Sequence, residues 1–169
     1  MVEYKRKDLR NMEYVMMALL VVIDQWSKIW IQNTPSMHGH VEVIPNFLYI
    51  TYVKNTGAAW SILEGKQMFL VIISMLEIIL LVYFMLKFKK KNETIAKWSI
   101  VLMIAGAIGN LIDRMMLGYV RDFVSTYPFG YAFPVFNIAD VCLTVGVILL
   151  AIYILIEDSK DEKKEKLNG

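Results

Sequence analysis

The sequence predicts a mainly α-helical integral membrane protein, a bundle of four transmembrane helices with a small extracytoplasmic β-sheet between the first two spans. Its 169 residues are 57% hydrophobic and 20% charged, and the charges are very unevenly distributed. Four long stretches carry no charge: Tyr14–Ile23, Met68–Leu76, Trp98–Ile112 and Val141–Ile156. A soluble protein of this size could not cover so much apolar surface, so a soluble enzyme, a nucleic-acid-binding module and a disordered chain are poor interpretations. The net charge of +2 gives no reason to expect a polyanionic partner such as a nucleic acid.

The four expected spans are Glu13–Ile31, Met68–Leu86, Lys97–Leu117 and Phe136–Ile156. Each is close to the roughly 20 residues that a helix needs to cross the hydrocarbon layer. We interpret the first as a retained helix, because it contains Asp24 and Lys28 and no small-residue cleavage site follows it. All four belong to one membrane-embedded domain that covers residues 1–169.

Lysine and arginine residues predict the orientation, because they gather on the cytoplasmic side of a membrane. Thirteen of them lie in the two chain ends and in the linker between spans two and three, against four at the other connections. We therefore expect both termini in the cytoplasm, with residues 157–169 as a charged cytoplasmic tail. The first and third connections then face outward.

The two outward connections differ in composition. Residues 32–67 contain β-branched and aromatic runs on either side of Pro45 and Asn46, which predicts a small hairpin or sheet. Residues 118–135 are rich in aromatic side chains, which favours a belt at the membrane–water interface. The His38-Gly39-His40 segment is expected to be an exposed loop rather than a pair of metal ligands.

Ionisable residues at membrane depth are costly, so each suggests a function. They are Asp24, Lys28, Glu77, Asp113, Arg114, Asp122 and Asp140. Span order and orientation place most of them in one layer near the outer surface, together with Asn110 and Asn137. Asn55 in the first outward connection can reach the same layer, and Glu77 lies near the middle of the second span.

Some of these residues have a structural interpretation. Asp24 and Lys28 are spaced i, i+4 and can pair on one helix face. Gly106 belongs to a small-residue face, with Ala105, Ala107 and Gly109, that lets another helix approach closely. Arg114 is expected to neutralise a nearby carboxylate and to fix its position.

Asp122 and Asp140 are left without an obvious cation, apart from Arg121, whose direction the sequence does not fix. Asp122 follows the third span by about two turns if that helix continues, and Asp140 lies in the first turns of the fourth. Two carboxylates that meet cannot both ionise, so they share one proton and titrate as a unit. Such a pair can hydrolyse a peptide bond without a metal, one member taking a proton from water while the other donates one. Transport and simple structural pairing remain open on spacing alone.

Five segments together make the sequence resemble the lipoprotein signal peptidases (signal peptidase II), a family of bacterial membrane aspartyl peptidases. Asp24–Lys28 matches D-x-x-[ST]-K, Asn55–Trp60 matches N-x-G-A-[AM]-[FW], and Gly106–Arg114 matches G-[AG]-x-G-N-x-x-D-R. Val120–Phe123 matches V-x-D-F, and Phe136–Asp140 matches F-N-x-A-D. The resemblance extends from about residue 12 to residue 156. Any one motif is weak, but five in order on four spans are specific.

The resemblance implies a catalytic dyad of Asp122 and Asp140, with no metal and no cofactor. It implies that the supporting and substrate-binding positions are Asn55, Asn110, Arg114, Asn137, Asp24, Lys28, Gly106 and Asp113. Members of the family sit in the bacterial cell membrane, with the site near its outer face. They cut the signal peptide of a prolipoprotein just before a cysteine that already bears a diacylglyceryl group, and the cyclic peptide globomycin inhibits them. The expected partners are such substrates and membrane lipids, and the protein is expected to be a monomer.

Three other functions fit part of the pattern. A metal-dependent membrane peptidase could use the carboxylates and asparagines as oxygen ligands, although no H-E-x-x-H motif is present. A small transporter could use the acidic residues as an ion site, although no internal repeat is visible. A scaffold that packs through small residues would not explain why the charged groups share one depth.

Overall fold

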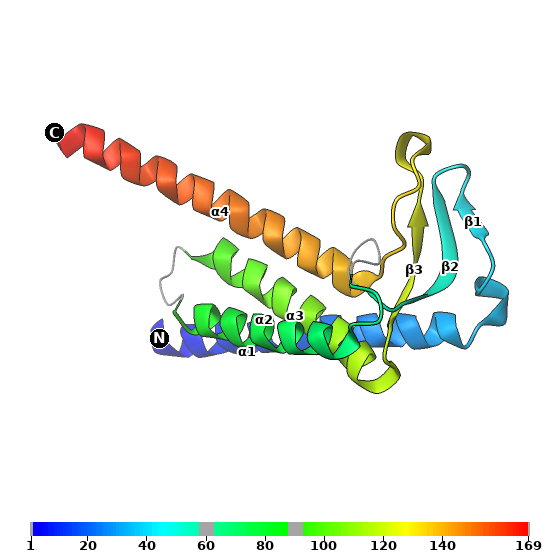
Figure 1. The fold of residues 1–169 in the computed structure, drawn as a ribbon. Coiled ribbons are helices and arrows are strands. Elements are labelled where there is room, and N and C mark those ends of the chain that lie inside the picture. Colours follow the sequence, from blue (N-terminus) through cyan, green and yellow to red (C-terminus); the bar gives the residue numbers. More distant parts are fainter. Residues whose placement is uncertain (1, 58–62, 88–92, 169) are drawn as a thin grey trace.

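Four long helices dominate the computed structural model, which describes residues 2–57, 63–87 and 93–168 (Figure 1). They are α1 (Val2–Gln32), α2 (Gln67–Lys87), α3 (Thr94–Leu117) and α4 (Ile138–Asn168). Each contains a segment long and apolar enough to cross a membrane, namely Met12–Gln32, Gln67–Lys87, Thr94–Leu117 and Ile138–Lys160. The four-span prediction is confirmed, and α4 continues as a helix through most of the charged tail.

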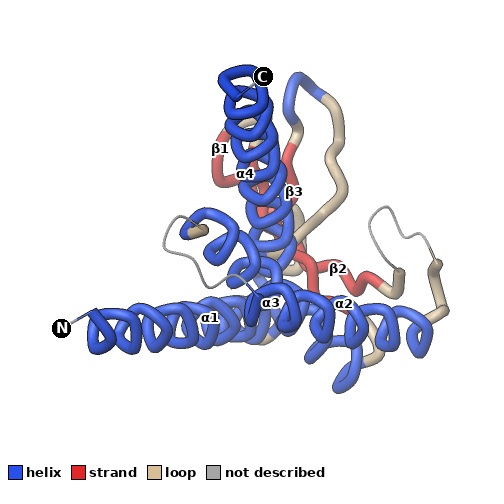
Figure 2. Tube along the Cα trace, turned by 90° about the vertical axis from the view of Figure 1, so that its left-hand side faces the viewer, coloured by secondary structure: helices blue, strands red, loops and turns tan. Residues whose placement is uncertain are grey.

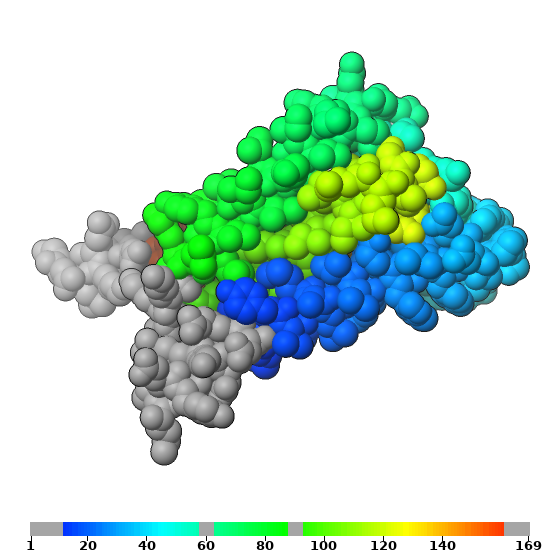
Figure 3. Space-filling view, turned by 90° about the horizontal axis from the view of Figure 1, so that it is seen from below, coloured from blue at the N-terminus to red at the C-terminus, as the bar shows by residue number. Residues whose placement is uncertain are grey.

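The helix α3 forms the centre of the bundle. It packs against α1, α2 and α4, and 56% of its apolar segment is buried, compared with 17% in α2 and α4. Figure 3 shows α1, α2 and the end of α3 side by side on one face. Figures 1 and 2 show α4 diverging from the other helices toward its C-terminal end. Most of the exposed side chains on α2 and on Val141–Ile156 of α4 are large and apolar, as expected for helices that face lipid.

Small residues allow α3 and α4 to approach closely near the site. A Cβ atom on Gly106 would collide with the backbone oxygen of Ala139, and one on Gly109 would lie 2.6 Å from Asp24 Oδ2. On α4, a Cβ atom on Gly146 would lie 2.8 Å from the backbone oxygen of Ser99. The small-residue face predicted around Gly106 therefore packs against the helix that carries Asp140.

The three strands form one antiparallel sheet in the order β1 (Val41–Ile44), β2 (Leu48–Asn55), β3 (Val120–Thr126). The sheet lies beside the ends of the helices where α1 ends and α4 begins (Figure 1). The predicted hairpin supplies β1 and β2, and the third strand comes from the connection between α3 and α4. The aromatic-belt interpretation of residues 118–135 is therefore wrong for β3, where Val120 and Phe123 are buried.

The end of α3 decides where Asp122 lies. Gly118 adopts a left-handed backbone with φ of 76°, and its N–H donates to the carbonyl of Arg114, which ends the helix. Asp122 therefore does not continue the helix, as the sequence alone allowed, but lies on β3 opposite Val53 of β2. A positive φ ends the α-helix at this point. The residue is a glycine because residues with a Cβ atom rarely adopt a positive φ.

Candidate active site

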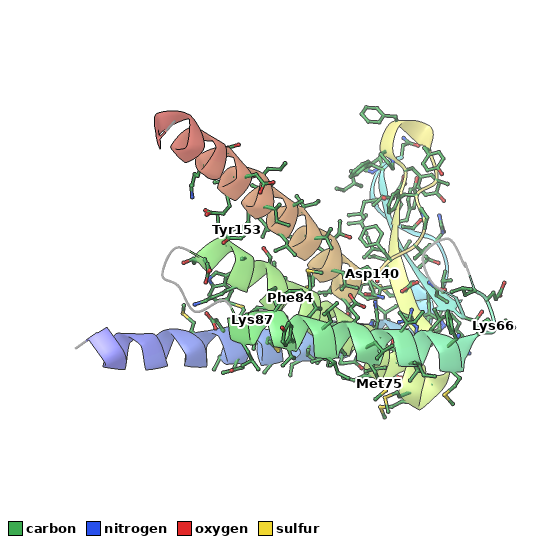
Figure 4. The ribbon with its side chains drawn as sticks, turned by 60° about the vertical axis from the view of Figure 1, so that its left-hand side comes forward. Lys66, Met75, Phe84, Lys87, Asp140 and Tyr153 are labelled. Carbon is green, nitrogen blue, oxygen red and sulfur yellow. The ribbon has the colours of Figure 1, made fainter. Side chains whose placement is uncertain are left out.

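Two backbone pairings of β3 bring Asp122 and Asp140 into one site. The strand β3 pairs with β2 on one side, and on the other Phe136 exchanges backbone hydrogen bonds with Val124 and accepts another from Phe123. The segment that leads into α4 is thereby held beside β3. Asp122 lies on the strand, and Asp140 lies in the first turn of α4, at the end of this helix that faces the sheet (Figure 4).

Asn137 joins the two carboxylates. Its side-chain Nδ2 donates to Asp122 Oδ1 at 2.6 Å, and its Oδ1 accepts from the backbone N–H of Asp140 at 3.0 Å. The backbone N–H of Asn137 donates in return to Asp140 Oδ2 at 3.1 Å. These last two bonds form a capping box at the start of α4. One fully buried amide therefore contacts both acidic residues.

Two further asparagines complete the hydrogen bonds to the dyad. Asn55 Nδ2 donates to Asp122 Oδ2 at 2.9 Å, and Asn110 Nδ2 donates to Asp140 Oδ1 at 2.7 Å. Each of these amides has its oxygen occupied by another donor. The backbone N–H of Gly57 bonds Asn55 Oδ1 at 2.9 Å, and Lys28 Nζ bonds Asn110 Oδ1 at 3.0 Å. Because the oxygens are occupied, the NH₂ groups face the carboxylates.

The environment of Asp122 favours its neutral form. Asp122 is only 2% exposed, and burial followed by the nearby charge of Asp140 raises its pKa to about 7. Hydrogen bonds from Asn55 and Asn137 act in the opposite direction. A carboxyl group with this pKa still holds a proton at near-neutral pH, as a general acid requires.

A buried ionic cluster lies behind the asparagines. The predicted pair is present, with Lys28 Nζ 2.9 Å from Asp24 Oδ2, and Lys28 is also 3.6 Å from Asp113 Oδ2. Asp24 Oδ1 accepts from the backbone N–H of Ala139 at 2.9 Å, which ties α1 to the first turn of α4. Arg121 forms the other ion pair with Asp113, at 2.6 Å.

Arg121 was not among the site residues expected from the sequence. Strand geometry turns adjacent side chains to opposite faces, so Arg121 points to Asp113 while Asp122 faces Asn137. A signal was available: Asp24 and Asp113 are two acidic residues at one depth, and Lys28 neutralises only one of them. A second cation was needed there.

Arg114 differs from the expectation. Among the described residues it forms no ion pair within 4.0 Å, and its Nη2 contacts the backbone oxygen of Gly57 at 3.4 Å. Its Nε is buried and has no hydrogen-bond partner in the part of the chain that the structure describes. Adjacent helix residues point about 100° apart, so Asp113 faces α1 and β3 while Arg114 faces the end of β2. The Arg114 charge acts through space on both Asp122 and Asp140.

Glu77 on α2 is half-buried and interacts electrostatically with Arg114. No described hydrogen bond links it to Asp122 or Asp140, so we expect Glu77→Gln to retain the activity of the site within about twofold, since glutamine keeps the shape and polarity of the side chain. Initial rates at equal membrane levels check this prediction. An inactive variant that inserts normally would show that Glu77 has a role in the reaction.

Comparison with known proteins identifies the family. The model for "Signal peptidase (SPase) II" matches residues 16–156. The chain belongs to the signal peptidase II family. Lipoprotein signal peptidases of Staphylococcus aureus strains JH9 and Newman are each 47% identical to it over 152 residues, which cover 89% of this chain and 93% of theirs.

Two solved structures confirm the fold. Each is described as a bacterial membrane enzyme structure obtained by the in meso method. The 2.3 Å structure has a TM-score of 0.81 and 44% identity, and the match covers 89% of this chain and 91% of that one. The 1.9 Å structure has a TM-score of 0.78 and 46% identity, with coverage of 86% and 93%. This member of the signal peptidase II family is a multi-pass membrane peptidase.

Proposed function

We propose that this peptidase is an aspartic endopeptidase that removes the signal peptide from diacylglyceryl-modified prolipoproteins, cutting just before the lipid-bearing cysteine. Asp122 and Asp140 are its catalytic dyad. The names of the Staphylococcus aureus relatives support lipoprotein precursors as the substrate. The observation that carries the mechanism is the single amide of Asn137, which contacts both acidic residues.

The two acidic residues have different surroundings, which supports different roles. Asp140 lies at the N-terminus of α4 and accepts from a backbone N–H and from Asn110. A helix N-terminus stabilises a negative charge, so Asp140 is the ionised member. Asp122, whose pKa is raised to about 7, carries the shared proton.

The reaction follows from this difference. Asp140 takes a proton from water as the water oxygen bonds to the scissile carbonyl carbon, and Asp122 gives its proton to the carbonyl oxygen. In the second step the C–N bond breaks, Asp140 passes its proton to the leaving nitrogen, and Asp122 recovers a proton from the hydroxyl group. Both residues return to their starting states, as a general acid–base pair requires.

The supporting positions have separate tasks in this proposal. Asn55, Asn110 and Asn137 orient the dyad, and Asp24, Lys28 and Asp113 hold the asparagines and the start of α4 in place. Gly106 permits the close packing of α3 on α4. Arg114, whose Nε has no hydrogen-bond partner among the described residues, binds the extended substrate backbone in this proposal.

We place both termini in the cytoplasm and the dyad near the outer face of the bacterial cell membrane. The distribution of lysine and arginine supports this orientation, since the sheet end of the bundle has few of them. A substrate anchored by its own signal helix and lipid tails can then reach the dyad by lateral diffusion. Residues 1–169 act as one monomeric domain, with membrane lipids around it and globomycin as an inhibitor.

The direct test incubates the detergent-purified protein with a diacylglyceryl-modified pre-lipoprotein and identifies the products by mass spectrometry. We expect a single cut before the modified cysteine, unaffected by a metal chelator and blocked by globomycin. The described residues contain no group of three His, Cys, Asp or Glu side chains placed to hold a metal ion. If a chelator abolished cleavage and added metal restored it, a metal-dependent mechanism would replace the Asp122–Asp140 mechanism. If the purified protein did not cleave the substrate at all, the proposed function would be refuted.

The pKa of Asp122 also predicts a pH dependence. A group that must be protonated loses its function as the pH rises through its pKa, so kcat/KM should decrease above an apparent pKa of about 7. At acid pH, protonation of the other member forms the second limb, and both values belong to the pair. Rates in detergent between pH 5 and about 9 check this prediction. A profile without an alkaline limb would contradict the general-acid role.

A further inference from the structure

Arg121, the residue directly before Asp122, forms the most extensive side-chain contacts described near the site. It is 6% exposed, and it holds Asp113 through three hydrogen bonds. Its backbone N–H and its Nε donate to Asp113 Oδ2 at 2.9 and 3.1 Å, and its Nη2 donates to Oδ1 at 2.6 Å. This two-pronged contact of guanidinium and carboxylate fixes both direction and distance.

The same guanidinium also reaches α1. Its Nη2 donates to Gln25 Oε1 at 2.9 Å, and its Nη1 donates to Gln32 Oε1 at 3.1 Å. Gln25 in turn donates to Asp113 Oδ1 at 3.2 Å and to the backbone oxygen of Gly109 at 2.9 Å. One side chain of β3 is therefore bonded to both α1 and α3.

Arg121 also balances the charge of the buried cluster. Asp24, Lys28, Asp113 and Arg121 are each at most 6% exposed, and their formal charges sum to zero. Lys28 lies between the two acidic residues and also donates to Asn110, whose amide donates to Asp140. Without Arg121, Lys28 would be the only cation in this cluster for two buried carboxylates.

We propose that Arg121 is a positioning residue for the reaction: it fixes Asp122 through the backbone of β3, and it leaves Lys28 free to hold the Asn110 amide toward Asp140. This inference rests on the proposed function, since it assumes that the dyad performs the chemistry. Arg121 occupies the unspecified position of V-x-D-F, so the motif does not assign it a role. Both members of the dyad therefore depend on this buried cluster. Asp122 depends on it through the backbone of β3, and Asp140 depends on it through Lys28 and Asn110.

The charges around Asp122 give the proposal a distinct signature. The charges that act on Asp122 are those of Asp140, Lys28 and Arg114. Lys28 in turn pairs with Asp24 and Asp113, and Arg121 pairs with Asp113, so the charge of Arg121 reaches Asp122 through this cluster. Removing the positive charge of Arg121 leaves the cluster with a net charge of −1. A nearby negative charge favours the protonated carboxyl group, so the pKa of Asp122 rises further. The alkaline limb of the pH profile then moves to higher pH.

Three variants separate charge from geometry. For Arg121→Gln we expect kcat to fall roughly 10- to 100-fold with KM nearly unchanged, and the alkaline limb to rise by about 0.5–1 pH unit. Arg121→Lys keeps the charge but cannot form the two-pronged contact, so it should keep the limb in place and recover only part of kcat. The double variant Asp113→Asn with Arg121→Gln is again neutral in this cluster, so its limb should return to the wild-type position.

The control is Lys54→Gln, which removes a charge from an exposed residue paired with Arg121 across the sheet. It should leave both kcat and the pH profile unchanged. If Arg121 were needed only for folding, its variants would reduce the amount of folded protein without moving the alkaline limb of the pH profile.

Wild-type kcat and pH profile in Arg121→Gln would overturn the inference. If that variant does not accumulate in membranes, wild-type kcat in both Arg121→Lys and the double variant would overturn it. Failure of the proposed function is separate, because it would appear as cleavage that survives Asp122→Asn or Asp140→Asn.

Discussion

We expect Asp122→Asn and Asp140→Asn each to reduce cleavage by roughly 10²–10⁴-fold or to nothing measurable, while the protein remains inserted in the membrane. Asparagine keeps the size of aspartate and can still form hydrogen bonds, but it can neither give nor accept the transferred proton. In the proposed mechanism the two variants remove different functions. Asp140→Asn removes the proposed base that activates water, and Asp122→Asn removes the proposed acid that protonates the carbonyl oxygen.

The measurement is kcat/KM on the diacylglyceryl-modified pre-lipoprotein in detergent, with the amount of folded protein checked by gel filtration. The matched control is Asp158→Asn, an exposed acidic residue on α4, which should retain full activity. Cleavage at an appreciable rate in either dyad variant would remove that residue from the mechanism.

The second large effect is expected at Asn137, because one side chain serves both acidic residues. Asn137→Ser keeps an oxygen that can accept from the backbone N–H of Asp140, so the cap of α4 is preserved. A serine is too short to donate to Asp122, which loses one of its two amide donors. We expect a loss in kcat of roughly 10²-fold with little loss of thermal stability.

Asn137→Ala tests how much the same residue contributes to the stability of the protein. Alanine removes the cap as well as the donor, so it should reduce the stability by about a further 1 kcal/mol while kcat falls to the level of the serine variant. In both variants Asp122 loses a hydrogen bond that lowers its pKa, so the alkaline limb should move to higher pH. An exposed asparagine after α1 provides the control, as Asn33→Ser should change nothing. Normal cleavage by Asn137→Ser would contradict the bridging role.

The meeting of Asp122 and Asp140 could be predicted from the sequence because hydropathy and charge place residues by depth. Once the spans and their order are known, residues at the outer end of one span and at the start of the next must share a layer. The Asp24–Lys28 pair and the small residues near Gly106 follow from helix periodicity alone. The structure confirms these local features.

The directions in which the side chains of that layer point could not be predicted in the same way. Arg114 forms no ion pair with a carboxylate among the described residues, because Asp113 and Arg114 point to different elements, although its charge acts through space on Asp122 and Asp140. Arg121 was left without an assigned direction, since its orientation depends on residues 118–126 ending a helix and forming a strand. That depends in turn on pairing with β2, which lies 65 or more residues earlier in the chain.

The amino-acid sequence alone establishes four spans, the layer in which the polar residues meet, and the family, because solvent transfer energies and short motifs depend on composition and spacing. The tertiary structure establishes which amide faces which carboxylate and which cation balances which acid. Those contacts join β3 to α1, α3 and α4, and hydrogen bonds require directions that only the packed chain defines.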